Sequence, residues 1–382
     1  MTNANGLKVM TPAELHAEVS ESKDLFILDL RNKDEFKQWK VEGKKPIPTL
    51  NLPYFDFVDD EAGSMARLPR DQEITLVCAT GNASEYIAEI LEANGFRTRN
   101  VEGGMAKWSI LYDHKPVIAT PDFALMQVNR VAKGCLSYLL VSGGEALVVD
   151  PGRHVDVYMA AIEAQGLKVT AVVDTHVHAD HISGGPELAD RTGALYYVAD
   201  DDMVGAPLAH LPLKDGDVLK VGKAVVKVLS LSTPGHTPGS SSLLINDQYF
   251  LSGDTLFVES VGRPDLGGKA KDWAYDLFDT LYDKIVGVAD DVLVLPAHYS
   301  SPDEIREGGL VAERLGRLRA ENHVFQLTDK EQFVEHILGD LPEQPESYAV
   351  MRLVNRGEVI PDEEKATELE IGANRCAAKH HH

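Results

Sequence analysis

The sequence predicts an α/β protein of two domains, in which a small parallel-sheet domain precedes a larger one with two sheets between layers of helices. Its 382 residues correspond to two or three domains at roughly 150 residues each. Up to residue 113, short apolar runs alternate with helical patterns, which is typical of a parallel sheet with helical connections. After residue 122, glycine-containing turns pair strands into hairpins between further helices, which indicates two mixed sheets.

The composition argues against several classes of protein. Hydrophobic residues make up 44% and charged residues 25%, which is ordinary for a globular chain and argues against disorder. The formal net charge of −23 argues against a nucleic-acid or membrane-surface partner, because both attract basic patches. No apolar run approaches the roughly 18 residues that span a bilayer. The three cysteines, Cys78, Cys135 and Cys376, are too few for a disulfide framework, so we expect a reducing, cytoplasmic location.

The first domain is predicted to cover residues 1–113. Its apolar runs at residues 25–30 and 74–78 have the length and composition of buried parallel strands. A helical pattern at residues 85–91 stops before Gly95, and glycine commonly terminates helices. Together these elements predict one compact parallel sheet with helices.

The rest of the chain divides at a proline-containing stretch. Residues 114–121 are predicted to form a linker, because prolines interrupt regular structure there. The second domain is predicted at residues 122–360, followed by an acidic C-terminal extension at residues 361–379. The three histidines at residues 380–382 resemble the stub of a purification tag and carry no weight here.

The strongest chemical signal follows a predicted strand at residues 169–175. The next positions hold His176, His178, Asp180 and His181, so three imidazoles and one carboxylate fall within six residues. Neutral imidazole offers a lone pair to a metal, and carboxylate offsets the charge of a divalent cation. A loop with this spacing can aim several ligands at one point or at two adjacent points, which predicts a metal centre.

Three later residues complete the set of metal ligands. His236 lies in the proline- and glycine-rich turn at residues 233–239, which can hold a ligand rigidly. Asp254 and His298 each follow a predicted strand. Each residue alone is a weak signal, but together and in this order they support the prediction of a metal centre.

From residue 122 onward the chain resembles enzymes of the metallo-β-lactamase fold. This resemblance implies an αββα sandwich with the metal at one edge of the sheets. Within that superfamily the chain is similar to glyoxalase II and, more closely, to the persulfide dioxygenases. The segments that carry the closer resemblance are residues 178–184, 253–257, 262–266 and 372–376.

The two relatives imply different uses of the same residues, and the spacing does not separate them. Resemblance to the persulfide dioxygenases implies one Fe(II) held by His176, His236 and Asp254, a set that leaves open positions for O2 and substrate. The remaining residues would then orient ligands and water: His178, Asp180, His181 and His298. We count Asp180 and His181 among the predicted catalytic residues, and the longer motifs favour this reading.

Resemblance to glyoxalase II instead implies two zinc ions with Asp254 between them, and a bridging hydroxide that attacks a thioester. One ion would be held by His176, His178 and His236. The other would be held by Asp180, His181 and His298.

The dioxygenase reading implies that a low-molecular-weight thiol persulfide, O2 and water give sulfite and thiol. Arg263 is a candidate for binding a carboxylate of the thiol through paired hydrogen bonds, and is otherwise a structural turn residue. Tyr197 and Tyr299 either line the substrate pocket or pack in the core. The carrier thiol stays open, and the sequence is compatible with a homo-oligomer.

Residues 1–113 resemble a rhodanese domain on three segments: residues 28–36, the strand that leads into Cys78, and residues 101–108. The resemblance implies that Cys78 carries a sulfane sulfur. Backbone N–H groups and a helix N-terminus would stabilise the anionic persulfide, and glycine permits the tight curl of such a loop. The predicted persulfide loop comprises Ala79, Thr80, Gly81, Asn82, Ala83 and Ser84.

The first domain departs from the rhodanese pattern at Ala83, where the commonest active loop carries an arginine. This departure weakens the expectation of thiosulfate sulfurtransferase activity and leaves persulfide acceptance by Cys78 as the prediction. Asp29 and Arg31 are expected to form a structural ion pair, and Cys135 to be a core residue. A persulfide carrier or sensor with a structural metal is the remaining alternative.

Overall fold

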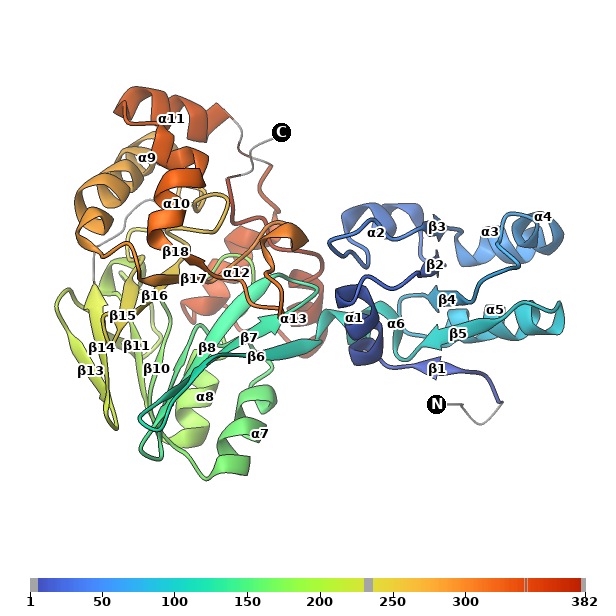
Figure 1. Cartoon of the computed structure of the whole chain (residues 1–382), viewed down its shortest axis with the longest axis horizontal. Helices are drawn as coiled ribbons and strands as arrows, with labels where there is room; N and C mark the ends of the chain where they lie inside the picture. The colour runs from blue at the N-terminus through green and yellow to red at the C-terminus, as the bar shows by residue number, and fades with distance from the viewer. Residues whose placement is uncertain (1–5, 230–235, 340, 342, 379–382) are drawn as a thin grey trace. The chain divides into compact units, whose positions relative to one another are not determined.

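The computed structural model describes residues 6–229, 236–339, 341 and 343–378 (Figure 1). The chain forms two compact units. One comprises Met1–Leu111 with Arg130–Lys133, and the other Tyr112–Asn129 with Gly134–His382.

The first unit contains the parallel sheet that the sequence predicts. Its five strands lie in the order β1-β5-β4-β2-β3, and every neighbouring pair is parallel. The strands are β1 (Val9–Met10), β2 (Phe26–Asp29), β3 (Thr49–Asn51), β4 (Ile74–Val77) and β5 (Thr98–Val101).

Helices cover both faces of this sheet, because successive strand residues point to opposite faces. Leu28 and Leu76 belong to one buried cluster, while their neighbours Ile27 and Val77 belong to the other with Trp108. The helices are α1 (Pro12–Ser20), α2 (Lys33–Gln38), α3 (Tyr54–Asp59), α4 (Glu61–Met65), α5 (Asn82–Ala93) and α6 (Gly104–Ser109).

The second unit has two sheets, as predicted. One has seven strands in the order β12-β11-β10-β9-β8-β7-β6, and the other six in the order β13 to β18. The first sheet comprises β6 (Tyr112–Ala119), β7 (Ala124–Arg130), β8 (Cys135–Ser142), β9 (Glu145–Val149), β10 (Lys168–Val173), β11 (Leu195–Val198) and β12 (Leu211–Pro212). The second comprises β13 (Val218–Val221), β14 (Ala224–Leu229), β15 (Ser242–Ile245), β16 (Tyr249–Gly253), β17 (Leu293–Pro296) and β18 (Glu313–Arg314).

The buried clusters of this unit confirm the αββα layering. One cluster joins residues of both sheets, such as Leu147 and Leu251, so the sheets pack face to face. Helices cover the outer face of each sheet, with Leu188 in one cluster and Leu277 and Phe333 in the other. The helices of this unit are α7 (Asp156–Gln165), α8 (Gly185–Thr192), α9 (Ala270–Asp279), α10 (Leu315–Glu321), α11 (Lys330–Gly339), α12 (Ser347–Asn355) and α13 (Glu363–Leu369).

The structure differs from the predicted linker at residues 114–121. Most of that stretch lies in β6, which is the edge strand of the seven-stranded sheet. A proline in a strand removes one N–H donor, and an edge strand tolerates this loss because one side has no partner strand. Pro116 therefore marks a sheet edge, and the prediction of an irregular linker is corrected.

The predicted C-terminal extension packs on the second unit. It contains α13, and its last described residues run beside residues 261–263, where Arg263 N–H donates to the Cys376 carbonyl at 2.8 Å. The three terminal histidines lie outside the described residues. None of the helices in the described residues is long and apolar enough to span a membrane.

Candidate functional site

The predicted metal ligands follow the carboxyl ends of strands in the second unit. His176 lies three residues after β10, Asp254 directly follows β16, and His298 follows β17 by two residues. Strands β16 and β17 are parallel neighbours, so their carboxyl ends meet at the same edge of the sheet. The turn that holds His236 begins at residues 233–235, which lie outside the described residues.

Three side chains converge to form what we call the ligand group: His176, His236 and Asp254. Their ligand atoms all lie within 4.8 Å of one another, and Asp254 Oδ2 is 3.1 Å from His236 Nε2 and 3.7 Å from His176 Nε2. All three atoms are buried and have no hydrogen-bond partner in the described part of the chain. Buried lone pairs without partners are costly, so this donor set fits a divalent cation.

The other ring nitrogen of each histidine fixes the direction of its ligand atom. His236 Nδ1 donates to the Arg263 carbonyl at 3.0 Å, and His176 Nδ1 is 3.0 Å from Thr175 Oγ1. Such contacts orient imidazole ligands in metal sites. Burial lowers the pKa of both His176 and His236, which favours the neutral imidazole that a metal requires.

His178 belongs to a different buried cluster. Its Nε2 is 3.2 Å from Asp150 Oδ1, and Asp150 also accepts hydrogen bonds from the Thr175 N–H and hydroxyl. Burial would lower the pKa of His178, but Asp150 and Asp174 outweigh it and raise this pKa to about 9. The geometry thus pairs His178 with Asp150, while its Nδ1 has no hydrogen-bond partner among the described residues.

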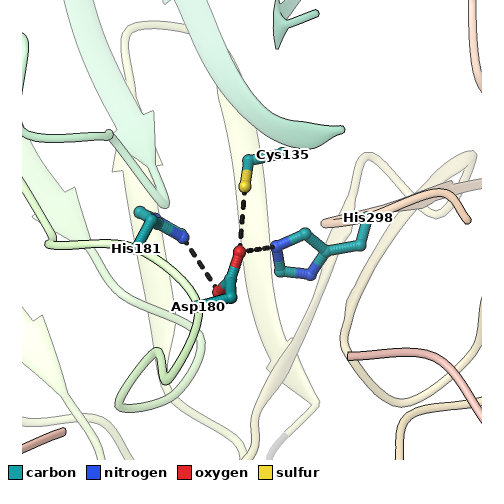
Figure 2. A group of neighbouring side chains, drawn as sticks. All are labelled: Cys135, Asp180, His181 and His298. Atoms are coloured by element: carbon teal, nitrogen blue, oxygen red, sulfur yellow. Dashed lines mark hydrogen bonds and ion pairs between the residues drawn. The ribbon is translucent and has the colours of Figure 1, made fainter. Parts of the chain in front are cut away.

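A second set of side chains, which we call the outer group, lies beside the ligand group: Cys135, Asp180, His181 and His298 (Figure 2). Asp180 is its centre, since Oδ2 accepts from His298 Nε2 at 2.9 Å and from the Cys135 thiol at 3.0 Å. Its Oδ1 is 3.1 Å from His181 Nδ1.

His298 joins the outer group to the ligand group. Its Nδ1 is 2.5 Å from Asp254 Oδ1, so the ring bridges the carboxylates of Asp254 and Asp180. Burial alone would lower the pKa of His298, but these two carboxylates outweigh it and hold the pKa well above the ordinary value. In turn, burial alone would raise the pKa of Asp180, but His298 and His181 together outweigh it and hold the pKa of that carboxyl low.

The structure brings two cysteines to this region, and sequence reasoning did not place Cys135 there. Cys135, predicted as a core residue, is buried, yet its thiol also belongs to the outer group. The Cys376 sulfur shares a cluster with Asp254 and His298, and burial raises its pKa. The backbone of Cys135 forms an antiparallel β-bridge with that of His298. Only this pairing brings Cys135 to the site, and the sequence around Cys135 does not reveal it.

The predicted substrate residues are buried or partly buried. The Arg263 guanidinium is fully buried, pairs with Asp265 at 2.7 and 2.9 Å and donates to the Arg375 carbonyl at 3.0 Å. Tyr299 lies in the core between the sheets, and Tyr197 packs against the same core. Arg263 thus has an internal carboxylate partner, and a role toward the thiol carrier stays a prediction for all three residues.

The Cys78 sulfur lies in a curled loop of the first unit. It accepts hydrogen bonds from the Gly81 N–H at 3.0 Å, the Ser84 N–H at 3.4 Å and the Ser84 hydroxyl at 3.2 Å. Gly81 has φ +92, and a Cβ there would lie 2.9 Å from the Gly103 nitrogen, so the curl requires glycine. The loop continues into α5, and this arrangement suits an anionic sulfur.

The remaining residues of the predicted persulfide loop differ in exposure. Ala79, Thr80 and Asn82 are exposed, and Ala83 is partly buried. The loop is held from behind, where the Met105 N–H donates to the Cys78 carbonyl at 2.9 Å. The expected ion pair between Asp29 and Arg31 forms in the interior, at 2.7 Å.

Comparison with known proteins gives two family matches. Residues 130–302 match the metallo-beta-lactamase superfamily, and residues 11–111 match the rhodanese-like domain. A Bacillus subtilis protein described as the probable metallo-hydrolase YqgX is 30% identical, over 45% of this chain and 88% of its own length. A hydroxyacylglutathione hydrolase of a Polaromonas species is 29% identical, over 54% of this chain and 87% of its own length.

Two persulfide-related proteins are also similar. The human mitochondrial persulfide dioxygenase ETHE1 is 31% identical, over 40% of this chain and 59% of its own length. The crystal structure of ETHE1 from Myxococcus xanthus aligns with a TM-score of 0.53 and 29% identity, over 61% of this chain and 97% of that one. The αββα unit, its buried histidines and these matches agree, and the chain belongs to the metallo-beta-lactamase superfamily, with a rhodanese-like domain preceding that unit.

Proposed function

We propose that this protein is a persulfide dioxygenase that converts a low-molecular-weight thiol persulfide, O2 and water to sulfite and thiol at a single Fe(II). The observation that carries the proposal is the ligand group, with two imidazoles and one carboxylate converging at a buried point. This donor set is typical of non-haem Fe(II) oxygenases. When bound there, Fe(II) would offer open coordination positions to both the persulfide sulfur and O2.

The neighbouring histidines support a single metal. In this structure His178 faces Asp150 at 3.2 Å, and both ring nitrogens of His298 face carboxylates. Neither histidine belongs to the ligand group, although His298 shares a separate cluster with Asp254 and Cys376. The similarity to the two ETHE1 proteins supports the same reading.

The outer group gives the site a means to hold protons. His298 can hold a proton at Nδ1 toward Asp254 or at Nε2 toward Asp180. The Asp180 carboxylate also accepts a hydrogen bond from the Cys135 thiol. We infer that Asp180 and His298 hold the proton that the released thiol takes up.

For the first unit we propose that Cys78 exchanges sulfane sulfur with a persulfide. The Cys78 thiolate attacks the terminal sulfur, the sulfur–sulfur bond of the donor breaks, and the carrier leaves as its thiol after taking up a proton. The three hydrogen bonds to Cys78 Sγ support an anionic persulfide at this position. This exchange requires Cys78 as a free thiol, and all three cysteines are free, in keeping with the cytoplasmic location that we propose.

A zinc-dependent thioester hydrolase is the second candidate. The similarity to a hydroxyacylglutathione hydrolase favours it, as does the outer group, whose Asp180, His181 and His298 could hold a second ion. A persulfide carrier or sensor that does not oxidise its substrate is a third, favoured by the donors around Cys78.

The test combines metal analysis with an oxygen electrode. The protein is purified without oxygen, its metals are quantified, and O2 uptake and sulfite are followed with glutathione persulfide. We expect about one iron per chain, with uptake that Asp254→Ala abolishes. Two zinc ions per chain with thioester cleavage would favour the hydrolase, and iron-loaded protein without O2 uptake would overturn the proposal.

A further inference from the structure

Asp202 lies between the two chain segments that carry the histidines of the ligand group. It ends the short helix η1 (Asp200–Asp202), and its side chain is buried. Its Oδ2 accepts hydrogen bonds from the Val177 N–H at 2.8 Å and from the Thr237 hydroxyl at 2.7 Å. Its Oδ1 accepts from the Gly239 N–H at 2.8 Å.

The partners of Asp202 are direct chain neighbours of the metal ligands. Val177 follows His176, and Thr237 follows His236. A single carboxylate oxygen therefore links the two segments one residue beyond each imidazole. Because a metal site requires its ligands at fixed separation, a link at this place limits how far the two imidazoles can move apart.

The surroundings of Asp202 are shaped to bring its carboxylate into contact with the second segment. A Cβ at Gly239 would lie 2.8 Å from Asp202 Cγ, so only glycine permits this approach. Arg356, which follows α12, donates to the Asp202 carbonyl at 2.5 Å and anchors its backbone. Both carboxylate oxygens are used as acceptors, whereas an asparagine amide would present only one acceptor oxygen.

We propose that Asp202 is a positioning residue that sets the separation of His176 and His236 for metal binding. The inference rests on the metal site of the proposed function, and it is independent of which metal binds there and of the reaction. Its consequence is that loss of the Asp202 links weakens metal binding more than it weakens the fold.

The test measures metal affinity in the full-length protein. Wild type, Asp202→Asn, Thr237→Val and the double variant are prepared without metal, and Fe(II) binding is measured anaerobically by competition with a chromogenic chelator. We expect Asp202→Asn to weaken Fe(II) binding about 10- to 100-fold and Thr237→Val to weaken it less. The double variant should resemble Asp202→Asn, because both changes break the same link. Zn(II) is measured in parallel.

Glu313→Gln is the matched control. Glu313 in β18 is another buried carboxylate, and it accepts from a backbone N–H at 2.7 Å and pairs with Arg306. We expect this change to lower the thermal midpoint of the metal-free protein while leaving metal affinity unchanged. If Asp202 had only a structural role, Asp202→Asn would behave like the control: its thermal midpoint would fall and its metal affinity would stay unchanged.

Unchanged affinity of Asp202→Asn for both metals would overturn the proposal, as would an equal loss in Glu313→Gln. If Asp202→Asn fails to fold, the metal affinity of Thr237→Val tests the proposal in its place. Thr237→Ser should then keep the wild-type affinity, because serine retains the hydroxyl. Failure of the proposed function looks different, since a protein that binds metal as predicted and consumes no O2 leaves the role of Asp202 intact.

Discussion

The buried pair of His178 and Asp150 makes the stability of the metal-free protein depend on pH. The pKa of His178 is raised from 6.5 to about 9, so the folded state holds this proton more tightly than the unfolded state. The stabilisation is fully present below about pH 6.5 and is lost as the pH rises through about 9. The difference corresponds to about 3 kcal/mol.

Asp150→Asn should remove this stabilisation. We expect the metal-free variant to be less stable than wild type at pH 6, with a gap that narrows as the pH approaches about 10. Denaturant unfolding across this range measures the gap. Asp156→Asn is the control, because Asp156 pairs with the Arg191 guanidinium, which stays charged across this range, so its gap should stay constant. A constant gap for Asp150→Asn would contradict the assignment.

At the same scale, the sequence revealed the residues whose chemistry is clustered along the chain. The segment from His176 to His181 is recognisable because several metal-binding residue types follow one strand. Cys135 and Asp202 give no such signal, since an isolated cysteine or aspartate is ordinary in any sequence. Their place beside the site depends on which strand ends and loops meet, and that is a property of the tertiary structure.

Among the elements, α12 holds the backbone of the loop at residues 178–183, which we call the histidine loop. Asn355, its last residue, donates to the carbonyls of His178 and His181, both at 2.8 Å. Its side-chain oxygen accepts from the Ser183 N–H at 2.9 Å. The buried Glu370 after α13 accepts from the Ile182 N–H at 2.9 Å. The C-terminal helices therefore fix the loop backbone from residue 178 to residue 183.

Asn355→Ala should loosen this loop. The change removes three hydrogen bonds to buried backbone groups, which lowers the free energy of unfolding by about 3 kcal/mol. We expect hydrogen exchange at residues 178–183 to accelerate as well. Asn322→Ala is the matched control, since Asn322 is another buried amide that donates to a different loop, at Val258 and Ser260.

The control should lose comparable stability without faster exchange at residues 178–183. Unchanged exchange in Asn355→Ala would show that the loop is held by its other contacts, such as that of Glu370.

The elements also show where reading the sequence succeeds and where it stops. Apolar runs such as β4 are visible because a strand covered by helices on both faces is continuously hydrophobic. The predicted linker was wrong because Pro116 signals only the loss of one donor, which a sheet edge accommodates as well as a loop does. The packing of α12 and α13 on the histidine loop at residues 178–183 could not be predicted, because it depends on contacts between residues that are far apart in the sequence.

At the scale of the whole molecule, each unit carries a candidate site built from its own residues. The donors to Cys78 Sγ come from Gly81 and Ser84 in the first unit, and the ligand group belongs to the second. Each unit also has separate buried clusters. The two proposed activities should therefore be separable by single substitutions in the full-length chain.

Cys78→Ala should leave O2 uptake with glutathione persulfide unchanged, because no residue of the ligand group is altered. Asp254→Ala should abolish that uptake, yet Cys78 should still acquire sulfur from the same persulfide, as measured by mass spectrometry of the first unit's peptides.

Ser84→Ala removes one donor to the Cys78 sulfur, about 1 kcal/mol of stabilisation, and should reduce the persulfide yield at Cys78 without affecting O2 uptake. If instead Cys78→Ala abolished O2 uptake, sulfur would have to pass through Cys78 before oxidation, and the two units would act in series on one substrate.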